Sequence, residues 1–275
     1  MDDIRRFLRE DVGRGDVTSE SLFAGERARG TIFARQPCIV AGLEEAGKVF
    51  KALDLGPKLL ARDGREVRAG TPVLVVEGRA VSILKGERLA LNFLMRMSGI
   101  ATETRRLVEM CRKRGAKVLV AGTRKTVPGF RRYDKKAIEL GGGWPHRMGL
   151  YDGILIKDNH LALLPITEAI RRAKHSRKPI EVEAGNERDA LEAAEAGADI
   201  VMLDNMSPAK AKRVSSILRH RHPKVKIEIS GGVTPENILL YARSADLISL
   251  GYLTHSVRAA NFSMDVEPTR RKRSR

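Results

Sequence analysis

The stretch that decides the fold is residues 180–203, which read IEVEAGNERDALEAAEAGADIVML. The apolar runs at 180–182 and 200–203 are typical of buried strands, and the segment between them has the spacing of a helix. After Asn186, small apolar side chains recur every three or four residues, which makes a face that packs on a sheet. These side chains belong to Ala190, Leu191, Ala194 and Ala198. The stretch therefore predicts a strand–helix–strand unit of a parallel sheet.

The same alternation extends over the rest of the chain after residue 115. The further strand candidates are residues 117–120, 153–156, 225–229 and 247–250. Ser207 and Thr234 each precede a proline, a pattern typical of a cap before the first residue of a helix. Successive strand–helix units of this kind predict an α/β fold, an incomplete (six- to seven-stranded) α/β barrel of TIM type. A doubly wound open sheet is the alternative, but no G-x-G-x-x-G motif follows the first strand.

The first hundred residues have a different pattern. Short β-like runs are separated by Gly and Asp-Gly turns, and helical spacing appears at residues 4–8, 44–53 and 83–97. This pattern predicts an N-terminal α+β sandwich domain. The expected parts of the chain are a sandwich domain over 1–103 joined by the C-terminal segment 257–268, a barrel over 104–256, and a disordered basic tail over 269–275.

Composition and charge exclude several classes of protein. Hydrophobic residues make up 42% of the chain, which is enough for a sizeable core and excludes a wholly disordered chain. The 51 Lys and Arg residues against 34 Asp and Glu give a net charge of +17, a balance that suits nucleic acid or small, multiply anionic substrates. Only 4% of the residues are aromatic, so platforms for stacking single-stranded nucleic acid are scarce. This scarcity argues against nucleic acid as the partner.

We expect a cytoplasmic protein that does not insert into a membrane. Charges break every apolar run before the ~18 residues that a membrane helix needs. The N-terminus lacks the apolar segment of a signal peptide. Cys38 and Cys111 lie far apart in the sequence and in no metal-ligand spacing, and they are too few for a disulfide scaffold. This use of cysteine favours a reducing compartment.

Polar residues follow each predicted barrel strand at its carboxyl end, where the active site of a parallel barrel lies. These strand ends are residues 123–126, 157–160, 183, 204–205, 230–232 and 251–256. Two of them are cationic, two are acidic and two are rich in glycine. A single polar residue of this kind would be no more than a strand end meeting water, but six in succession indicate a site for an anionic substrate.

The glycine-rich and acidic ends each suggest a ligand. Main-chain N–H groups in the Ser-Gly-Gly turn at 230–232, running into a capped helix, would cradle a phosphate with help from the helix dipole. The alternative is that these glycines serve only tight turns. Glu183 and Asp204 end adjacent strands and are natural ligands for Mg²⁺ or for ribose hydroxyl groups, since Mg²⁺ prefers one or two carboxylates plus substrate phosphates. Their alternative role is ion pairing with Lys125 or Lys157.

Residues 141–147, which read GGGWPHR, add a second cationic segment. Three glycines let the backbone approach a ligand closely, and the guanidinium groups of Arg124 and Arg147 are each suited to bidentate pairing with a carboxylate. Together with Lys125 and Lys157, they predict a strongly cationic pocket whose ligand carries several negative charges.

At this point the sequence resembles a known family, quinolinate phosphoribosyltransferase. The resemblance covers nearly the whole chain and is carried by long, ordered motifs. These motifs are 10–18 (EDVGRGDVT), 87–92 (ERLALN), 98–102 (SGIAT), 123–131 (TRKTVPGFR), 141–143 (GGG), 146–147 (HR), 157–160 (KDNH), 203–205 (LDN), 230–232 (SGG) and 253–256 (LTHS). One departure is Pro145, where the family more usually has Asn, because proline removes a donor and fixes φ beside His146.

The resemblance implies transfer of a phosphoribosyl group from phosphoribosyl pyrophosphate to the nitrogen of quinolinate, with release of CO₂ and pyrophosphate. The product would be nicotinate mononucleotide for NAD biosynthesis, and the cofactor would be Mg²⁺. The family is dimeric or larger, and in it the arginine that matches Arg88 reaches across from a partner subunit. Decarboxylation would need no further cofactor, because the alkylated ring accepts the electrons of the breaking bond.

The resemblance also implies roles for individual residues. The residues that would bind quinolinate are Arg88, Thr123, Arg124, His146, Arg147 and Lys157. The residues that would bind phosphoribosyl pyrophosphate are Lys125, Glu183, Asp204, Ser230, Gly231, Gly232, Gly251 and His255. Catalytic roles would fall to Lys125, Lys157, Glu183 and Asp204. Glu183 and Asp204 would also hold the Mg²⁺, directly or through water.

Three other functions compete with this interpretation. A phosphoribosyltransferase-like protein of molybdenum transport loci shares the fold, but the full set of cations at Arg88, Arg124, Arg147 and Lys157 argues for quinolinate. A Schiff-base lyase would use Lys157 at its strand end, but that chemistry does not explain three arginines. The third alternative is a basic nucleic-acid-binding protein with the tail as its arm.

Overall fold

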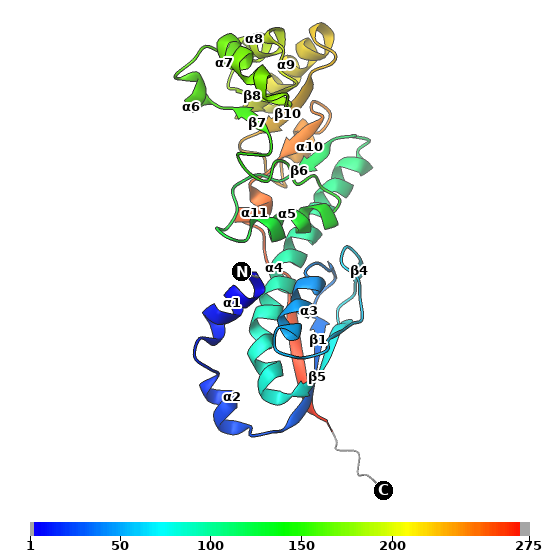
Figure 1. Ribbon diagram of the computed structural model, residues 1–275. Coiled ribbons are helices and arrows are strands. Elements are labelled where there is room, and N and C mark those ends of the chain that lie inside the picture. The colour runs from blue at the N-terminus through cyan, green and yellow to red at the C-terminus, as the bar shows by residue number, and fades with distance from the viewer. Residues whose placement is uncertain (1–2, 270–275) are drawn as a thin grey trace. The chain divides into compact units, whose positions relative to one another are not determined.

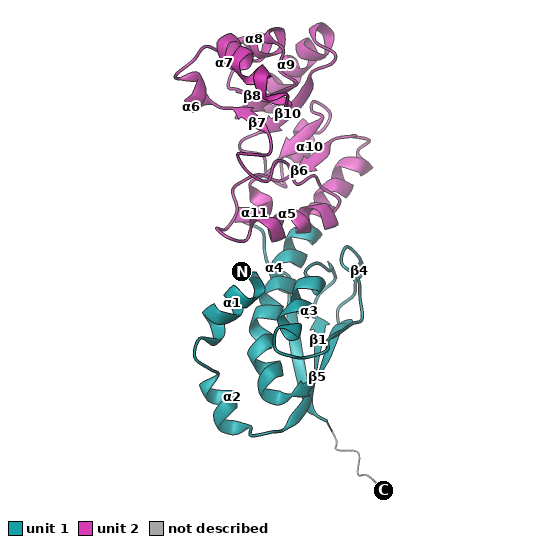
Figure 2. Ribbon diagram, viewed as in Figure 1, with its two compact units in different colours: residues 1–102, 257–275 teal, residues 103–256 magenta. Residues whose placement is uncertain are grey.

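The computed structural model describes residues 3–269 of the chain. The chain separates into two compact units, Met1–Thr102 with Val257–Arg275 and Glu103–Ser256 (Figure 2). The division falls inside one long helix, α4 (Ala80–Lys113). No proline interrupts this helix, which explains why it extends well beyond the predicted residues 83–97. The disorder predicted for the tail concerns residues that, apart from Thr269, lie outside the described range.

The first unit is built on a four-stranded antiparallel sheet in the order β12-β1-β5-β3 (Figure 1). Its strands are β1 (Arg27–Ala34), β3 (Lys58–Leu59), β5 (Pro72–Arg79) and β12 (Phe262–Pro268). A two-stranded sheet joins β2 (Cys38–Ile39) and β4 (Glu66–Val67). The helices are α1 (Asp3–Val12), α2 (Val17–Leu22), α3 (Leu43–Lys51) and the first part of α4. Because β12 pairs with β1, the C-terminal segment is part of this unit.

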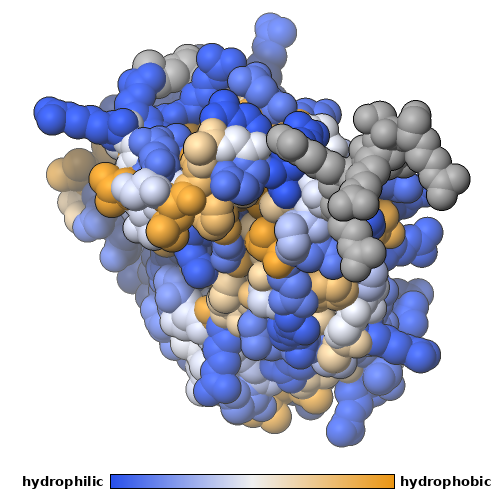
Figure 3. All heavy atoms as spheres, turned by 90° about the horizontal axis from the view of Figure 1, so that it is seen from below, coloured by the Kyte–Doolittle hydropathy of each residue, from blue (hydrophilic) through white to orange (hydrophobic). Residues whose placement is uncertain are grey.

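The core of the first unit lies between the sheet and α4. Burial alternates along β1, as expected for a strand with one face covered, and Ile32 is fully buried. A Cβ added to Gly30 would lie 3.0 Å from Cγ2 of Ile83, so α4 packs directly on this strand. On the surface, Val17 and Leu22 of α2 are exposed. Figure 3 shows one face of the protein, on which apolar side chains lie in small groups among hydrophilic ones.

The second unit is the incomplete α/β barrel. Its six-stranded sheet has the order β6-β11-β10-β9-β8-β7, and all its pairings are parallel. The strands are β6 (Leu119–Ala121), β7 (Ile154–Ile156), β8 (Ile180–Ala184), β9 (Ile200–Asp204), β10 (Lys226–Ser230) and β11 (Leu247–Ser249). The edge strands β6 and β7 are consecutive in the chain, and beside β6 a single parallel bridge joins Ala121 to Trp144. The predicted fold is confirmed.

Helices follow the barrel strands and cover the sheet (Figure 1). They are α5 (Arg131–Leu140), α6 (Asp158–Leu161), α7 (Ile166–Ala173), the 3-10 helix η1 (Lys174–Ser176), α8 (Glu187–Ala196), α9 (Pro208–Arg221), α10 (Ile238–Tyr241) and α11 (Tyr252–His255). Ser207 caps α9 as predicted, because its side chain accepts the N–H of Lys210. In α8, Ala190, Ala193 and Ala194 are buried against the barrel core. Among residues 3–269, no helix is both long enough and apolar enough to cross a bilayer.

The prediction that Thr234 caps a helix is wrong. Pro235 begins a turn, and α10 starts only at Ile238 and has four residues. The side chain of Asn237 accepts the N–H of Thr234, so the segment is held as a turn by a side chain to its C-terminal side. The glycine-rich turn at 230–232 therefore does not run directly into a helix.

Candidate active site

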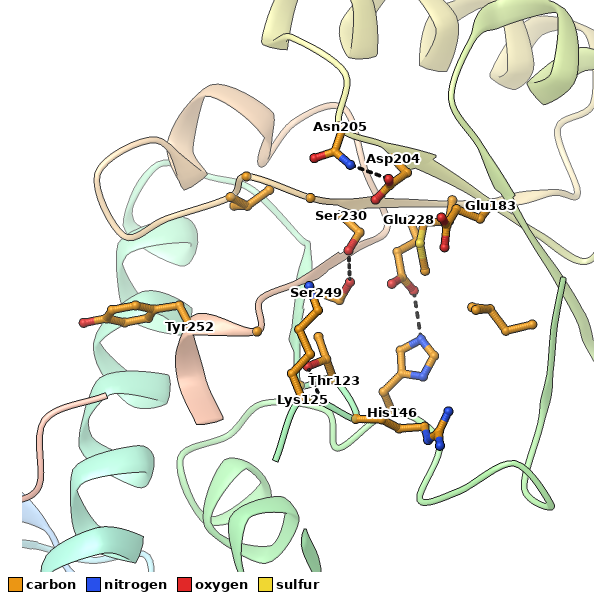
Figure 4. Close-up of a pocket in the computed structure, with 18 of the residues that line it drawn as sticks. Thr123, Lys125, His146, Glu183, Asp204, Asn205, Glu228, Ser230, Ser249 and Tyr252 are labelled. Atoms are coloured by element: carbon orange, nitrogen blue, oxygen red, sulfur yellow. Dashed lines mark hydrogen bonds and ion pairs between the residues drawn. The ribbon is translucent and has the colours of Figure 1, made fainter. Parts of the chain in front are cut away.

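A cavity of about 780 Å³ lies at the carboxyl ends of the barrel strands (Figure 4), within the roughly 300–1,000 Å³ typical of small-molecule sites. Every site residue predicted within the barrel lines it. These are Thr123, Arg124, Lys125, His146, Arg147, Lys157, Glu183, Asp204, Ser230, Gly231, Gly232, Gly251 and His255. Arg88 belongs to α4 in the other unit and is not among the lining residues.

The loop after β6 brings to the cavity the guanidinium of Arg124, which has no partner among the described residues. The Thr123 hydroxyl accepts the main-chain N–H of Lys125 at 3.1 Å, and the Thr254 hydroxyl donates to the Lys125 carbonyl at 2.6 Å. These two bonds fix the loop. Between them, Nε of Arg124 is buried and makes no hydrogen bond to any described residue. A buried, unpaired N–H destabilises the free protein, so this position favours a ligand that brings an acceptor.

Arg147 enters the same cavity from the loop after α5. Its Nη1 donates to the Gly153 carbonyl at 3.1 Å, which leaves other guanidinium N–H groups for a ligand. Burial and the neighbouring positive charge of Arg124 lower the pKa of Arg147. A bound anion would reduce the electrostatic repulsion between these two guanidinium groups.

The acidic residues occupy two adjacent strands. The carboxylate of Glu183 on β8 accepts Nζ of Lys157 at 2.5 Å, and that of Asp204 at the end of β9 accepts Nδ2 of Asn205 at 2.5 Å. The predicted ion pair between Glu183 and Lys157 is therefore present. Both carboxylates line the cavity, so a cation or a sugar hydroxyl would compete with these side chains for the same oxygen atoms.

The turn after β10 has the geometry of an anion cradle. Gly231 and Gly232 adopt φ values of +76° and +61°, a region that favours glycine. A Cβ on Gly231 would lie 2.4 Å from Oδ1 of Asn205, so no side chain fits there. Ser249 donates its hydroxyl to that of Ser230 at 3.0 Å, which holds the start of the turn (Figure 4). Because α10 is short and lies further on, the main-chain N–H groups themselves would carry the anion-binding role.

We predict that Gly231→Ala weakens binding of the phosphorylated substrate. The new Cβ would force Asn205 away and would strain a left-handed residue, so we expect KM for that substrate to rise about tenfold or more. Gly185→Ala is the matched control, because a Cβ there meets nothing within 4 Å. Steady-state kinetics with both variants check this, and an unchanged KM in Gly231→Ala would refute it.

Sequence reasoning missed two buried acidic residues at the cavity, Glu228, which lines it, and Glu181, which does not. Glu181 of β8 is 4% exposed and Glu228 of β10 is fully buried, and both contact His146. A signal for them existed, because each lies two residues before a recognised site residue, Glu183 or Ser230, and so points to the same face of its strand. Charged residues at inward-facing strand positions are costly unless they have a partner there.

These features define an α/β-barrel protein with a polyanion site at its strand ends, in which an unpaired guanidinium and a glycine cradle face two carboxylates. Two family profiles match this chain. The profile described as quinolinate phosphoribosyl transferase, N-terminal domain, matches residues 16–98, and the one described as its C-terminal domain matches residues 100–265. Together they cover most of the chain.

Curated relatives and solved structures point to the same family as the two profiles. The chain is 43% identical over 272 residues to a probable nicotinate-nucleotide pyrophosphorylase (carboxylating) of Methanocaldococcus jannaschii, covering 96% of this chain and 95% of that protein. It is 38% identical over 250 residues to the rat protein named nicotinate-nucleotide pyrophosphorylase (carboxylating), covering 89% and 84%. The solved nicotinate-nucleotide pyrophosphorylase of Francisella tularensis superposes with a TM-score of 0.88 at 36% identity, covering 96% and 94%. The chain belongs to the quinolinate phosphoribosyltransferase family.

Proposed function

We propose that this cavity transfers a phosphoribosyl group from phosphoribosyl pyrophosphate to the nitrogen of quinolinate. Pyrophosphate and CO₂ leave, and nicotinate mononucleotide is formed for NAD biosynthesis. The observation that carries the proposal is one cavity that joins two guanidinium groups of like charge, Arg147 and Arg124 with its unpaired Nε, to the glycine cradle at 231–232. That combination suits a dicarboxylate beside a phosphorylated sugar. The curated relatives, matched over nearly their full length, are named for this reaction.

We assign the quinolinate end to Thr123, Arg124, His146, Arg147 and Lys157. Guanidinium groups pair with planar carboxylates through two parallel hydrogen bonds, which fixes the ring as well as binding it. Arg88 is exposed and has no hydrogen bond or ion pair within residues 3–269, so its guanidinium is free to bind a substrate carboxylate. We therefore propose a homodimer or larger assembly in which Arg88 enters the partner's cavity.

We assign phosphoribosyl pyrophosphate to the remaining predicted site residues of the cavity. The 5′-phosphate would lie on the turn formed by Ser230, Gly231 and Gly232, with Gly251 and His255 beside it. A Cβ on Gly251 would lie 2.8 Å from Nε2 of His255, so a larger residue there would displace the His255 side chain. Lys125, Glu183 and Asp204 would then meet the pyrophosphate and the ribose.

The proposed chemistry follows from where the charges lie. Bond breaking at C1′ leaves an oxocarbenium-like ribose, and the carboxylates of Glu183 and Asp204 stabilise this positive charge. The ring nitrogen then attacks C1′, and the resulting cationic ring stabilises the electron pair left at C2 when the C2–carboxylate bond breaks. CO₂ leaves, and a proton from water takes its place at C2. Arg124 and Arg147 contact the carboxylates before and during transfer, so they act mainly as binding groups.

The residues present fit Mg²⁺. Two carboxylates on adjacent strands, with pyrophosphate oxygens as further ligands, are the hard oxygen donors that this ion prefers. Glu183 and Asp204 would hold the ion, directly or through water. When bound, it would neutralise the charge of the departing pyrophosphate.

The direct test is an assay of the purified protein with quinolinate, phosphoribosyl pyrophosphate and Mg²⁺, with nicotinate mononucleotide as the measured product. Absence of product, with the protein folded, would overturn the proposal. The molybdenum-locus protein, the lyase and the nucleic-acid-binding protein are not favoured by the names of the relatives. We propose a cytoplasmic location, which is supported by Cys38 and Cys111, both free thiols.

We predict that Glu183→Ala and Asp204→Ala each lower kcat on the order of 100- to 1,000-fold, the usual effect of losing a charge that stabilises a transition state. Quinolinate binding should change less than threefold, because neither carboxylate is assigned to that substrate. Glu195→Ala is the control, since Glu195 is an exposed acidic residue of α8 outside the cavity. Loss of quinolinate binding in a folded Glu183 or Asp204 variant would show that this division of the cavity is wrong.

A further inference from the structure

Two carboxylates are buried inside the barrel beside the quinolinate end of the cavity. Oε2 of Glu228 lies 3.1 Å from Nε2 of His146 (Figure 4). Oε2 of Glu181 lies 3.4 Å from the same atom. The remaining oxygen, Oε1, of each glutamate has no hydrogen-bond partner among the described residues. Burying two carboxylates on a single partner is costly, so their presence calls for an explanation.

The second ring nitrogen of His146, Nδ1, is also hydrogen-bonded. Nδ1 of His146 accepts the main-chain N–H of Arg147 at 2.8 Å, and only an unprotonated ring nitrogen accepts a hydrogen bond. In this geometry Nε2 therefore carries the proton and donates it to the glutamates. Burial alone would lower the pKa of His146, but the hydrogen bonds that Nε2 donates to both glutamates raise it to about 9. Nε2 carries a proton in both the neutral and the charged ring, whereas Nδ1 accepts the N–H of Arg147 in the neutral ring, the form that this geometry describes.

The backbone at His146 is also in a conformation that needs support. His146 has φ of +58°, a left-handed value that residues other than glycine seldom adopt and that persists only where the surroundings hold it. The buried amine of Lys135 donates to the carbonyls on both sides, those of Pro145 and Arg147. The loop is thus fixed through its carbonyls by Lys135 and through its ring by Glu181 and Glu228.

We propose that Glu228 and Glu181 are positioning residues for quinolinate. They hold the His146 ring, the ring fixes the main chain of Arg147 through Nδ1, and the main chain aims the Arg147 guanidinium into the cavity. Glu228 also lines the cavity, but this positioning role requires neither glutamate to contact the substrate. The inference rests on the proposed function, because it concerns how that same site recognises its dicarboxylate.

Simple electrostatics predicts the opposite effect. A buried negative charge close to the site of a dianion repels it, so removing the charge alone would strengthen quinolinate binding. Positioning predicts weaker binding when the acceptor is lost, and normal binding when an acceptor of the same shape replaces the carboxylate. The sign of the change in KM for quinolinate therefore separates the two explanations.

The experiment compares Glu228→Met with Glu228→Gln, two side chains of similar length of which only Gln offers a strong acceptor to Nε2–H. We expect Glu228→Met to raise KM for quinolinate about tenfold or more, the usual effect of losing a hydrogen bond to a charged group. KM for phosphoribosyl pyrophosphate should change less than twofold, and Glu228→Gln should restore KM for quinolinate to within threefold of the wild type. Glu181→Met and Glu181→Gln give the same comparison if Glu228→Met does not fold.

Several results would overturn the inference. These are a lower KM for quinolinate in either Glu228 variant, an unchanged KM in Glu228→Met, and an equal rise in both KM values with a fall in Tm, which would mark a purely structural role. The ligand atoms of His146, Glu181 and Glu228 all lie within 4.8 Å of one another. A stoichiometric transition metal in the wild type, lost in Glu228→Gln, would instead make this cluster a metal site.

Wild-type turnover is measured first. Its absence would refute the proposed function and this inference together, whereas the other results refute the inference alone.

Discussion

Nicotinate is expected to react far more slowly than quinolinate with phosphoribosyl pyrophosphate. Nicotinate lacks the carboxylate at C2, so part of the cationic wall formed by Arg124 and Arg147 would stay desolvated and unpaired. Leaving one partner of a buried charge pair uncompensated costs on the order of 2–5 kcal/mol. We therefore expect kcat/KM for nicotinate to be roughly 30- to 5,000-fold lower than for quinolinate.

Both substrates would give the same product, so one detection method measures both rates. The comparison uses the same enzyme at a fixed, saturating concentration of phosphoribosyl pyrophosphate. In Arg124→Ala the preference for quinolinate should shrink, because a smaller cationic wall gains less from the second carboxylate. Nicotinate turnover within tenfold of quinolinate turnover in the wild type would contradict this account of the cavity.

The carboxyl ends of the barrel strands could be predicted because the side chains change abruptly there from apolar to polar. Apolar runs that stop at Lys157, Glu183 or Ser230 identify both a strand and its exposed end. In a parallel barrel all such ends meet on one side, so side chains far apart in sequence converge in a single cavity. The residues that line the cavity could therefore be predicted from the sequence alone.

The contacts that hold the His146 ring could not be predicted in the same way. Glu181 and Glu228 lie within strands, and their importance depends on the His146 ring, which comes from a different loop. The left-handed backbone at His146 also depends on tertiary contacts, because residues other than glycine seldom adopt this conformation unless their surroundings hold it. Alternation along β8 and β10 indicates that these glutamates face inward, but only the three-dimensional structure shows what they contact.

Sequence rules for helices also failed at two places in the chain. Thr234 and Pro235 have the sequence of a helix start, yet the side chain of Asn237 holds the segment as a turn. In α4, glycine at position 99 would weaken an isolated helix. Here a Cβ would lie 2.3 Å from the carbonyl of Arg258, so close packing against the returning chain requires glycine inside the helix.

Each active site is expected to be built from two chains, with Arg88 of one chain completing the cavity of the other. Arg88 is an exposed residue of α4 without a partner among residues 3–269. Lys157 lines that cavity. We expect Arg88→Ala and Lys157→Ala each to lower kcat/KM about 100-fold, because each loses a charge-assisted contact to a substrate carboxylate.

Mixing the two variants tests whether the site is shared. In a heterodimer of Arg88→Ala and Lys157→Ala, one cavity carries both lesions and the other carries neither. Random reassociation makes about half of the dimers mixed, so about a quarter of the wild-type activity should return. The control mixture is Arg124→Ala with Lys157→Ala, because both of these residues line the same cavity and every site then keeps a lesion. If verified heterodimers of the first mixture stay as inactive as the second, Arg88 acts within its own chain or has no role in catalysis.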